Sequence, residues 1–166
     1  MSLDLILVRH ALTENAKSPQ GDFERRLLPE GRKQCELLGE YFREKNFRIE
    51  TIMSSPAERT RTTANLIANQ LALPPGALTY HDSIYTSGMQ QVVALIRTQH
   101  NQEKTIMLVG HNPTISMVAN FFATDITTGL HPCDAVLIQF NSGSWADVNA
   151  ANTIHAEWIQ NAILSK

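Results

Sequence analysis

Short apolar runs alternate with amphipathic stretches along most of the chain, and this alternation restricts the possible fold more than any other feature. The apolar runs have the length and composition of buried strands, whereas the amphipathic stretches repeat their apolar residues at helical spacing. The predicted strands are 3–8, 51–54, 105–109, 135–140 and 153–158, and the predicted helices are 30–45, 56–71, 88–99 and 115–122. Strands that alternate with helices predict a three-layer α/β/α sandwich around a mixed, mainly parallel sheet.

The segment 11–28 departs from this pattern. It is polar, contains Pro19 and Gly21, and has neither the strand nor the helix period. An irregular stretch of this length inside a compact domain is usually functional or mobile. No linker and no internal repeat divides the 166 residues, so the sequence predicts one domain, 1–166.

Charge and cysteine content limit the classes of partner. A net charge of −2 and a pI near 6.3 argue against a protein that binds nucleic acid. The first apolar run is too short for a secretory signal or a membrane span, so we expect no membrane partner and a cytoplasmic location. Cys35 and Cys133 lack metal-type spacing and are interpreted as reduced structural thiols.

Three polar motifs each follow a predicted strand. Arg9 and His10 follow the first strand, Ser-Pro-Ala-Glu-Arg at 55–59 follows the second, and Gly-His-Asn-Pro at 110–113 follows the central apolar strand. Ligands of open α/β sheets bind outside the carboxyl ends of the strands. The three motifs are therefore expected to meet in one crevice, although about 50 residues separate each from the next.

Two of these motifs also have the residue types that begin helices. Ser55 is expected to cap a helix that begins at Pro56, and Asn112 to cap one that begins at Pro113. Both helices would then direct free N–H groups and positive dipole ends at the crevice. That arrangement favours an anion.

The cationic side chains of the motifs point to the same kind of ligand. Two guanidinium groups, Arg9 and Arg59, accompany two imidazoles, His10 and His111. The planar fork of arginine matches two phosphate oxygens at once, so this set suits a tetrahedral dianion. Helical spacing does not separate Arg59 from Arg61, because the two flank the same apolar stripe on opposite sides.

The three motifs, in this order, resemble those of the histidine phosphatase superfamily, which has the phosphoglycerate mutase-like fold. Within it, the chain resembles the short phosphohistidine phosphatases of the SixA type. The resemblance extends from Leu5 to about Trp158. The stretches that carry it are 9–11, 22–27 ahead of Gly31, 54–60 with 63–64, and 108–113.

The resemblance implies a role for each matched residue. His10 would be the nucleophile, and water would hydrolyse the phospho-His10 intermediate in a second step. The catalytic set would be completed by Arg9, Arg59 and His111, which offset charge on the phosphoryl oxygens. The implied phosphate-binding residues are Arg9, Arg25, Arg59, His111 and Asn112. No metal or other cofactor is implied, since the arginines supply the positive charge. Only the motif match favours Arg59 over its neighbour.

Two departures from the superfamily pattern bear on the substrate. Ala11 replaces the usual glycine, as it often does in the short phosphohistidine phosphatases. The region 81–88 has no glutamate to serve as general acid, which leaves Asp82, Asp22 and Glu24 as candidates. A missing acid penalises alkoxide leaving groups most. Phosphohistidine on a signalling or phosphotransfer protein is therefore the expected substrate, because its imidazole can leave protonated.

Three alternatives remain open. One is a small-molecule phosphomonoester phosphatase of the same superfamily. A second is a metal-dependent hydrolase that uses His10, His111 and Asp82, although no H-x-H or H-E-x-x-H spacing is present. The third is a module that binds phosphate or a phosphoprotein without catalysis.

Overall fold

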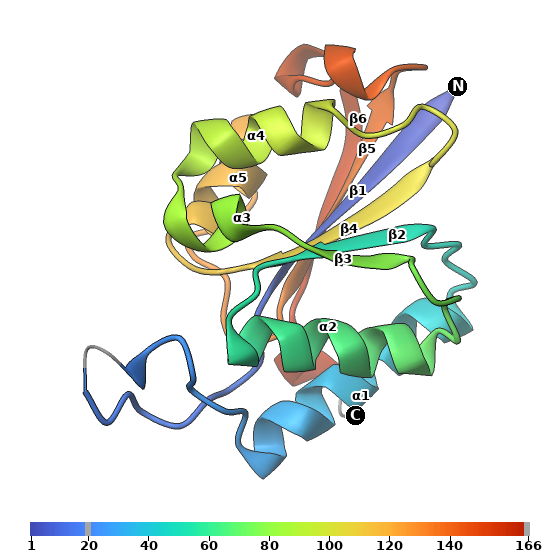
Figure 1. Ribbon diagram of the computed structural model, residues 1–166. Helices are drawn as coiled ribbons and strands as arrows, with labels where there is room; N and C mark the ends of the chain where they lie inside the picture. The colour runs from blue at the N-terminus through green and yellow to red at the C-terminus, as the bar shows by residue number, and fades with distance from the viewer. Residues whose placement is uncertain (19–20, 165–166) are drawn as a thin grey trace.

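A computed structural model describes residues 1–18 and 21–164 of the chain (Figure 1). Pro19, one of the residues on which the predicted irregular segment rested, lies outside the described residues, as does the end of the predicted domain, 165–166. In the described part, no helix combines the length and the apolar character needed to cross a membrane.

Six strands form one mixed sheet in the order β3-β2-β4-β1-β5-β6. β1, β2, β3 and β4 run parallel to one another, whereas β5 pairs antiparallel with both β1 and β6. The strands are β1 Ser2–Arg9, β2 Thr51–Ser54, β3 Leu78–Tyr80, β4 Thr105–Gly110, β5 Ala135–Asn141 and β6 Thr153–Ile159. The predicted sandwich with a mainly parallel mixed sheet is confirmed.

Helices cover both faces of this sheet, as Figure 1 shows. α1 and α2 pack on one face, and α3, α4 and α5 lie on the other. Their bounds are α1 Pro29–Glu44, α2 Glu58–Gln70, α3 Asp82–Thr86, α4 Met89–Arg97 and α5 Thr114–Phe122. In the described part of the chain, short 3-10 helices occur at η2 Trp145–Asp147, η3 Ala150–Asn152 and η4 Asn161–Ile163.

The strand period divides the apolar residues between two cores. In β1, Leu5 and Leu7 pack toward α4 and α5, whereas Ile6 and Val8 pack toward α1 and α2. Successive side chains of a strand point to opposite faces, so a strand buried on both sides needs an unbroken apolar run. This is why β1 contains the apolar run 5–8 and β4 the apolar run 106–109.

The structure differs from the sequence prediction in two short elements. β3 and α3 were not predicted. β3 has only three residues and lies at the edge of the sheet, and α3 has only five residues. Elements this short contain too few apolar residues to establish a period.

The predicted helix caps are wrong. α2 begins at Glu58, two residues later than expected, because the Ser55 hydroxyl accepts from the N–H of Ala57 (3.3 Å) within a bend that precedes the helix. α5 begins at Thr114, and the Asn112 side chain caps nothing. Its Oδ1 instead accepts from the Ser116 hydroxyl at 2.6 Å.

Sheet register brings the ends of β1, β2 and β4 together. Arg9 pairs with Gly110, and Ser54 pairs with Val109. The backbone N–H of His10 donates to the Gly110 carbonyl (3.1 Å) immediately beyond this pair. All three motifs therefore lie at one edge of the sheet, as the strand order requires.

The long segment after β1 is anchored beside this edge. Leu28 N–H donates to the Leu12 carbonyl (3.0 Å), and Thr13 forms an isolated bridge with Leu27. α1 approaches the segment so closely that a Cβ on Gly31 would lie 2.2 Å from the Leu12 oxygen. Only glycine fits there, because the contact is with backbone that cannot move aside cheaply.

Candidate active site

His10 is the first residue after β1 and only 7% of it is exposed. Its Nδ1 lies 2.9 Å from the carbonyl oxygen of Ala11. A carbonyl oxygen only accepts, so the ring proton is assigned to Nδ1 and the lone pair to Nε2. In this tautomer Nε2 is the ring nitrogen that has a free lone pair.

His111 faces His10 across the end of the sheet. The ring centroids are 5.5 Å apart, and His111 Nε2 lies 2.8 Å from the Ser55 hydroxyl. That hydroxyl accepts from the Ala57 N–H, which leaves its own proton for Nε2. This pairing favours a proton on His111 Nδ1, an atom that is buried and has no partner.

Arg9 is positioned by the segment that follows α5. Its guanidinium donates to the Leu130 carbonyl at 2.8 Å, while its Nε is buried without a partner. Asn112 Nδ2 donates to the same carbonyl at 2.8 Å. In this structure Asn112 therefore orients the residue that supports Arg9, which is an indirect contribution to the predicted phosphate site.

The structure separates Arg59 from Arg61. The Arg59 side chain is 6% exposed and donates to the Asp22 carbonyl (2.6 Å) and to the Asp22 carboxylate (3.1 Å). Its Nε is buried without a partner. Arg61 is exposed and lies over the ring of Tyr80, 4.9 Å from the centroid. Only Arg59 belongs to the cluster around His10.

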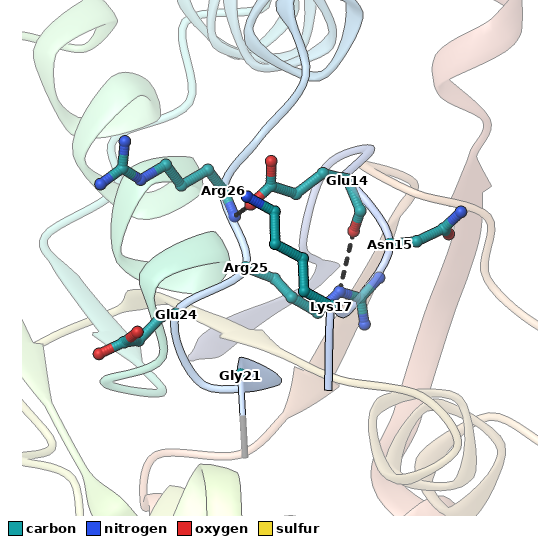
Figure 2. Close-up of a pocket in the computed structure, with 7 residues that line it drawn as sticks. All are labelled: Glu14, Asn15, Lys17, Gly21, Glu24, Arg25 and Arg26. Atoms are coloured by element: carbon teal, nitrogen blue, oxygen red, sulfur yellow. Dashed lines mark hydrogen bonds between the residues drawn. The ribbon is translucent and has the colours of Figure 1, made fainter. Parts of the chain in front are cut away.

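Arg25 joins the site from the long segment. It donates to the Glu14 carbonyl (3.0 Å), the Thr13 hydroxyl (2.6 Å) and the Asp22 carboxylate (3.2 Å). Figure 2 shows its side chain beside Glu14 in the wall of a surface hollow of about 310 Å³. The hollow is lined by Glu14, Asn15, Lys17, Gly21, Glu24, Arg25 and Arg26. It lies next to the His10 cluster and shares Arg25 with it.

Asp22 and Tyr85 complete the cluster. The Asp22 carboxylate accepts from Arg25, Arg59 and the Tyr85 hydroxyl, the last at 3.1 Å. The Tyr85 ring also packs edge-on against His111, with centroids 5.5 Å apart. Asp22 was weighed from sequence only as an acid, and Tyr85 was missed, because it lies in the unpredicted helix α3.

Burial and the arginines determine which of these groups are charged. Burial, followed by the charge of Arg59, lowers the pKa of His10 to about 4 and that of His111 to about 3, so both are neutral at pH 7. Burial alone would raise the pKa of Asp22. The hydrogen bonds and charges of Arg25 and Arg59 outweigh that effect and lower it, which keeps Asp22 a carboxylate.

These shifts predict the pH dependence expected if His10 is the nucleophile. In that case kcat/KM should fall with a midpoint near pH 4, because the imidazole stays neutral until the pH approaches its lowered pKa of about 4. The profile should be measured in the acid range and corrected for ionisation of the substrate phosphate, which has a second pKa of about 6. A midpoint at the ordinary histidine value of 6.5 would contradict a buried, neutral His10.

The unpartnered polar atoms of the cluster indicate what it can bind. Among the described residues, the buried side-chain nitrogen and oxygen atoms without a hydrogen-bond partner are Arg9 Nε, Arg59 Nε and His111 Nδ1. Buried polar groups in native proteins almost always have partners, so three in one cluster call for a ligand. All three can donate, and an oxyanion would supply the acceptors.

Residues 1–18 and 21–164 contain no group of three histidine, cysteine or acidic side chains placed to hold a metal ion. His10 and His111 instead face arginines.

Sequence comparison matches the part of the chain that contains the first two motifs. Residues 5–79 match the model of the histidine phosphatase superfamily (branch 1). An uncharacterised protein of Mycobacterium leprae is 32% identical over 98 residues, which cover 59% of this chain and 58% of that protein. An uncharacterised protein of Mycobacterium tuberculosis is 26% identical over 152 residues, which cover 85% of this chain and 91% of that protein.

Solved structures share the fold. The protein histidine phosphatase SixA complexed with tungstate superposes with a TM-score of 0.78 at 15% identity, over 98% of this chain and 99% of that one. A putative SixA of Nakamurella multipartitia gives a TM-score of 0.74 at 22% identity, over 95% and 94%. A mycobacterial glucosyl-3-phosphoglycerate phosphatase gives 0.60 at 16% identity, over 97% and 99%. These similarities confirm the predicted phosphoglycerate mutase-like fold.

Proposed function

We propose that the chain is a phosphatase of the histidine phosphatase superfamily, whose model matches residues 5–79, and that it acts through a phospho-His10 intermediate. One observation carries the proposal. The buried, neutral imidazole of His10 has its Nε2 lone pair free, and the unpartnered donors of Arg9, Arg59 and His111 surround the same end of the sheet.

The chemistry follows in two displacements. In the first, His10 Nε2 attacks phosphorus in line, the bond to the leaving group breaks, and the leaving group takes the electron pair. In the second, water attacks phospho-His10, releases inorganic phosphate and returns the neutral imidazole. Arg9, Arg59 and His111 would hold the phosphoryl oxygens in both steps, where fixed donors contribute most to the rate.

We propose that this reaction needs no metal, because the arginines offset the charge of the phosphoryl group. Activity is expected to persist in EDTA and to be inhibited by vanadate or tungstate, which mimic the transferred group. Inhibition should be competitive, and a crystal soak should place the anion against Arg9, His10, Arg59 and His111. An anion bound elsewhere would contradict the site assignment. Loss of activity in EDTA would favour the metal-dependent hydrolase instead.

The proposed substrate is phosphohistidine on a signalling or phosphotransfer protein in the cytoplasm. We infer that none of the candidate acids Asp22, Asp82 and Glu24 protonates an alkoxide leaving group. Asp22 is held as a carboxylate by Arg25 and Arg59, and Asp82 and Glu24 are exposed. An imidazole leaving group needs no general acid from the protein, since it can depart protonated. The likeness in fold to proteins named phosphohistidine phosphatases supports this choice.

The test is a comparison of kcat/KM on a phosphohistidine protein, an aryl phosphate and a sugar phosphate. We expect the phosphohistidine protein to be fastest and the sugar phosphate slowest, because protonation of a poor leaving group is where a general acid contributes roughly a hundredfold or more. A faster sugar phosphate would favour the small-molecule alternative. The glucosyl-3-phosphoglycerate phosphatase has the same fold, which is compatible with that alternative. No turnover of any substrate would favour a non-catalytic phosphate-binding module.

A further inference from the structure

Four aromatic rings form a continuous series from the nucleophile to the surface. The successive pairs are His10 with His111, His111 with Tyr85, and Tyr85 with Phe23, with centroid distances of 5.5, 5.5 and 5.1 Å. His10 is 7% exposed, whereas Phe23 at the other end is 41% exposed. The series therefore leads from the buried imidazole to solvent along one side of the cluster.

The two outer rings are held in place. The Tyr85 hydroxyl donates to the Asp22 carboxylate at 3.1 Å, and its ring lies 6.0 Å from the Arg59 guanidinium carbon. The Phe23 carbonyl accepts from the N–H of Glu58, the first residue of α2, at 3.0 Å. Edge-on packing between the two rings fixes the Phe23 side chain further. These contacts tie the long segment to both α2 and α3.

We propose that Phe23 and Tyr85 form an aromatic wall that selects substrates whose leaving group is a flat ring. The inference rests on the proposed function, and it names the residues that would set the substrate class. With phosphorus attacked from the His10 side, the leaving group must depart on the opposite side of phosphorus, away from the buried nucleophile. We place the leaving group on the side of Phe23, because that ring is the exposed end of the series.

Aromatic rings favour a planar partner over a flexible or small one. Edge-to-face and offset contacts between rings add to simple apolar burial, and an imidazole or phenyl leaving group can make them. An ammonia or short alkyl leaving group gains little from the same wall. The wall is neutral, because burial and the hydrogen bond to Asp22 raise the pKa of Tyr85, so it does not repel a phosphorylated substrate.

The test compares phosphoimidazole with phosphoramidate. Both have a phosphorus–nitrogen bond, but only the first has a ring in the leaving group. Phe23→Leu is expected to lower kcat/KM for phosphoimidazole roughly twofold to tenfold, the loss of one aromatic contact, and to leave phosphoramidate within about twofold of wild type. Phe23→Tyr, which keeps the ring, should retain the wild-type ratio of the two substrates. Comparing this ratio between variant and wild type cancels the difference in intrinsic reactivity between the two compounds.

Two further variants serve as controls for the aromatic wall. Tyr80→Leu removes an exposed tyrosine that packs against Arg61, outside the cluster, and should leave both substrates unchanged. Tyr85→Phe keeps the ring but removes the hydrogen bond to Asp22, so it should slow both substrates equally. Thermal unfolding of every variant checks that the fold is retained.

The outcomes distinguish this inference from the proposed function. Equal losses on both substrates in Phe23→Leu, with wild-type turnover and a phosphoenzyme still present, would overturn the wall alone. If wild-type protein hydrolyses neither compound, the proposed function fails and the wall fails with it. A loss confined to phosphoimidazole supports both.

Discussion

Replacing His10 with alanine is expected to abolish turnover, with a loss of roughly a thousandfold or more in kcat/KM. The alanine provides no lone pair for attack on phosphorus, and the donors left behind cannot form the covalent intermediate. Hydrolysis of an aryl phosphate, which gives a continuous signal, is the measurement. Wild-type protein quenched during turnover should also contain acid-labile phosphate on His10, and the variant should contain none.

The matched control is His100→Ala. His100 is exposed and lies outside the described cluster, so its loss should leave the rate unchanged. His10→Ala should also keep its unfolding transition close to that of wild type, because the ring makes one hydrogen bond, to its own neighbour Ala11. A folded variant that keeps even a tenth of the wild-type rate would overturn the covalent mechanism.

Arg59→Ala is the substitution with the next largest expected effect. Removing one charged donor from a buried transition-state site costs on the order of a hundredfold to a thousandfold in rate. Arg59 is 6% exposed, and its Nε has no partner in the free protein, so a phosphoryl oxygen would be its acceptor. The same assay should show a fall in kcat and kcat/KM together, since the contact strengthens in the transition state.

Arg61→Ala provides the control for Arg59, two residues away on the same helix. Arg61 is exposed and packs on Tyr80, so we expect its loss to change the rate by less than about twofold. Equal losses at the two positions, or a larger one at Arg61, would show that the wrong arginine has been assigned. Because Arg59 also pairs with Asp22, urea unfolding must accompany the kinetics. Arg59→Lys keeps the charge and separates charge from bidentate geometry.

Asp22 holds several side chains of the cluster in place. Its carboxylate and carbonyl together connect the long segment to Arg59, Arg25 and Tyr85. The residue is a hydrogen-bond acceptor at the centre of the cluster, and its lowered pKa keeps it in that role. We therefore expect Asp22 to position Arg59, which makes it a poor candidate for the general acid.

Much of the fold follows from local patterns in the chain. A central strand needs a nearly continuous apolar run because both of its faces are buried, and 5–8 and 106–109 are such runs. A helix against the sheet needs an apolar stripe, which Cys35, Leu38 and Phe42 provide in α1. Residues directly after parallel strands must share one edge of the sheet, which is why His10 and His111 could be placed together in advance.

Other features could be decided only by tertiary contacts. The motif match favours Arg59 over Arg61, but helical spacing does not, and the physical reason is a contact with Asp22, 37 residues away. The position of Tyr85 depends on the same residue, 63 away. Asn112 was expected to cap a helix, but Leu130 and Ser116 occupy its amide. Periodicity and motif order describe which residues share a face or an edge. They contain no information on which donor meets which acceptor across the site, because that depends on side-chain packing between segments far apart in sequence.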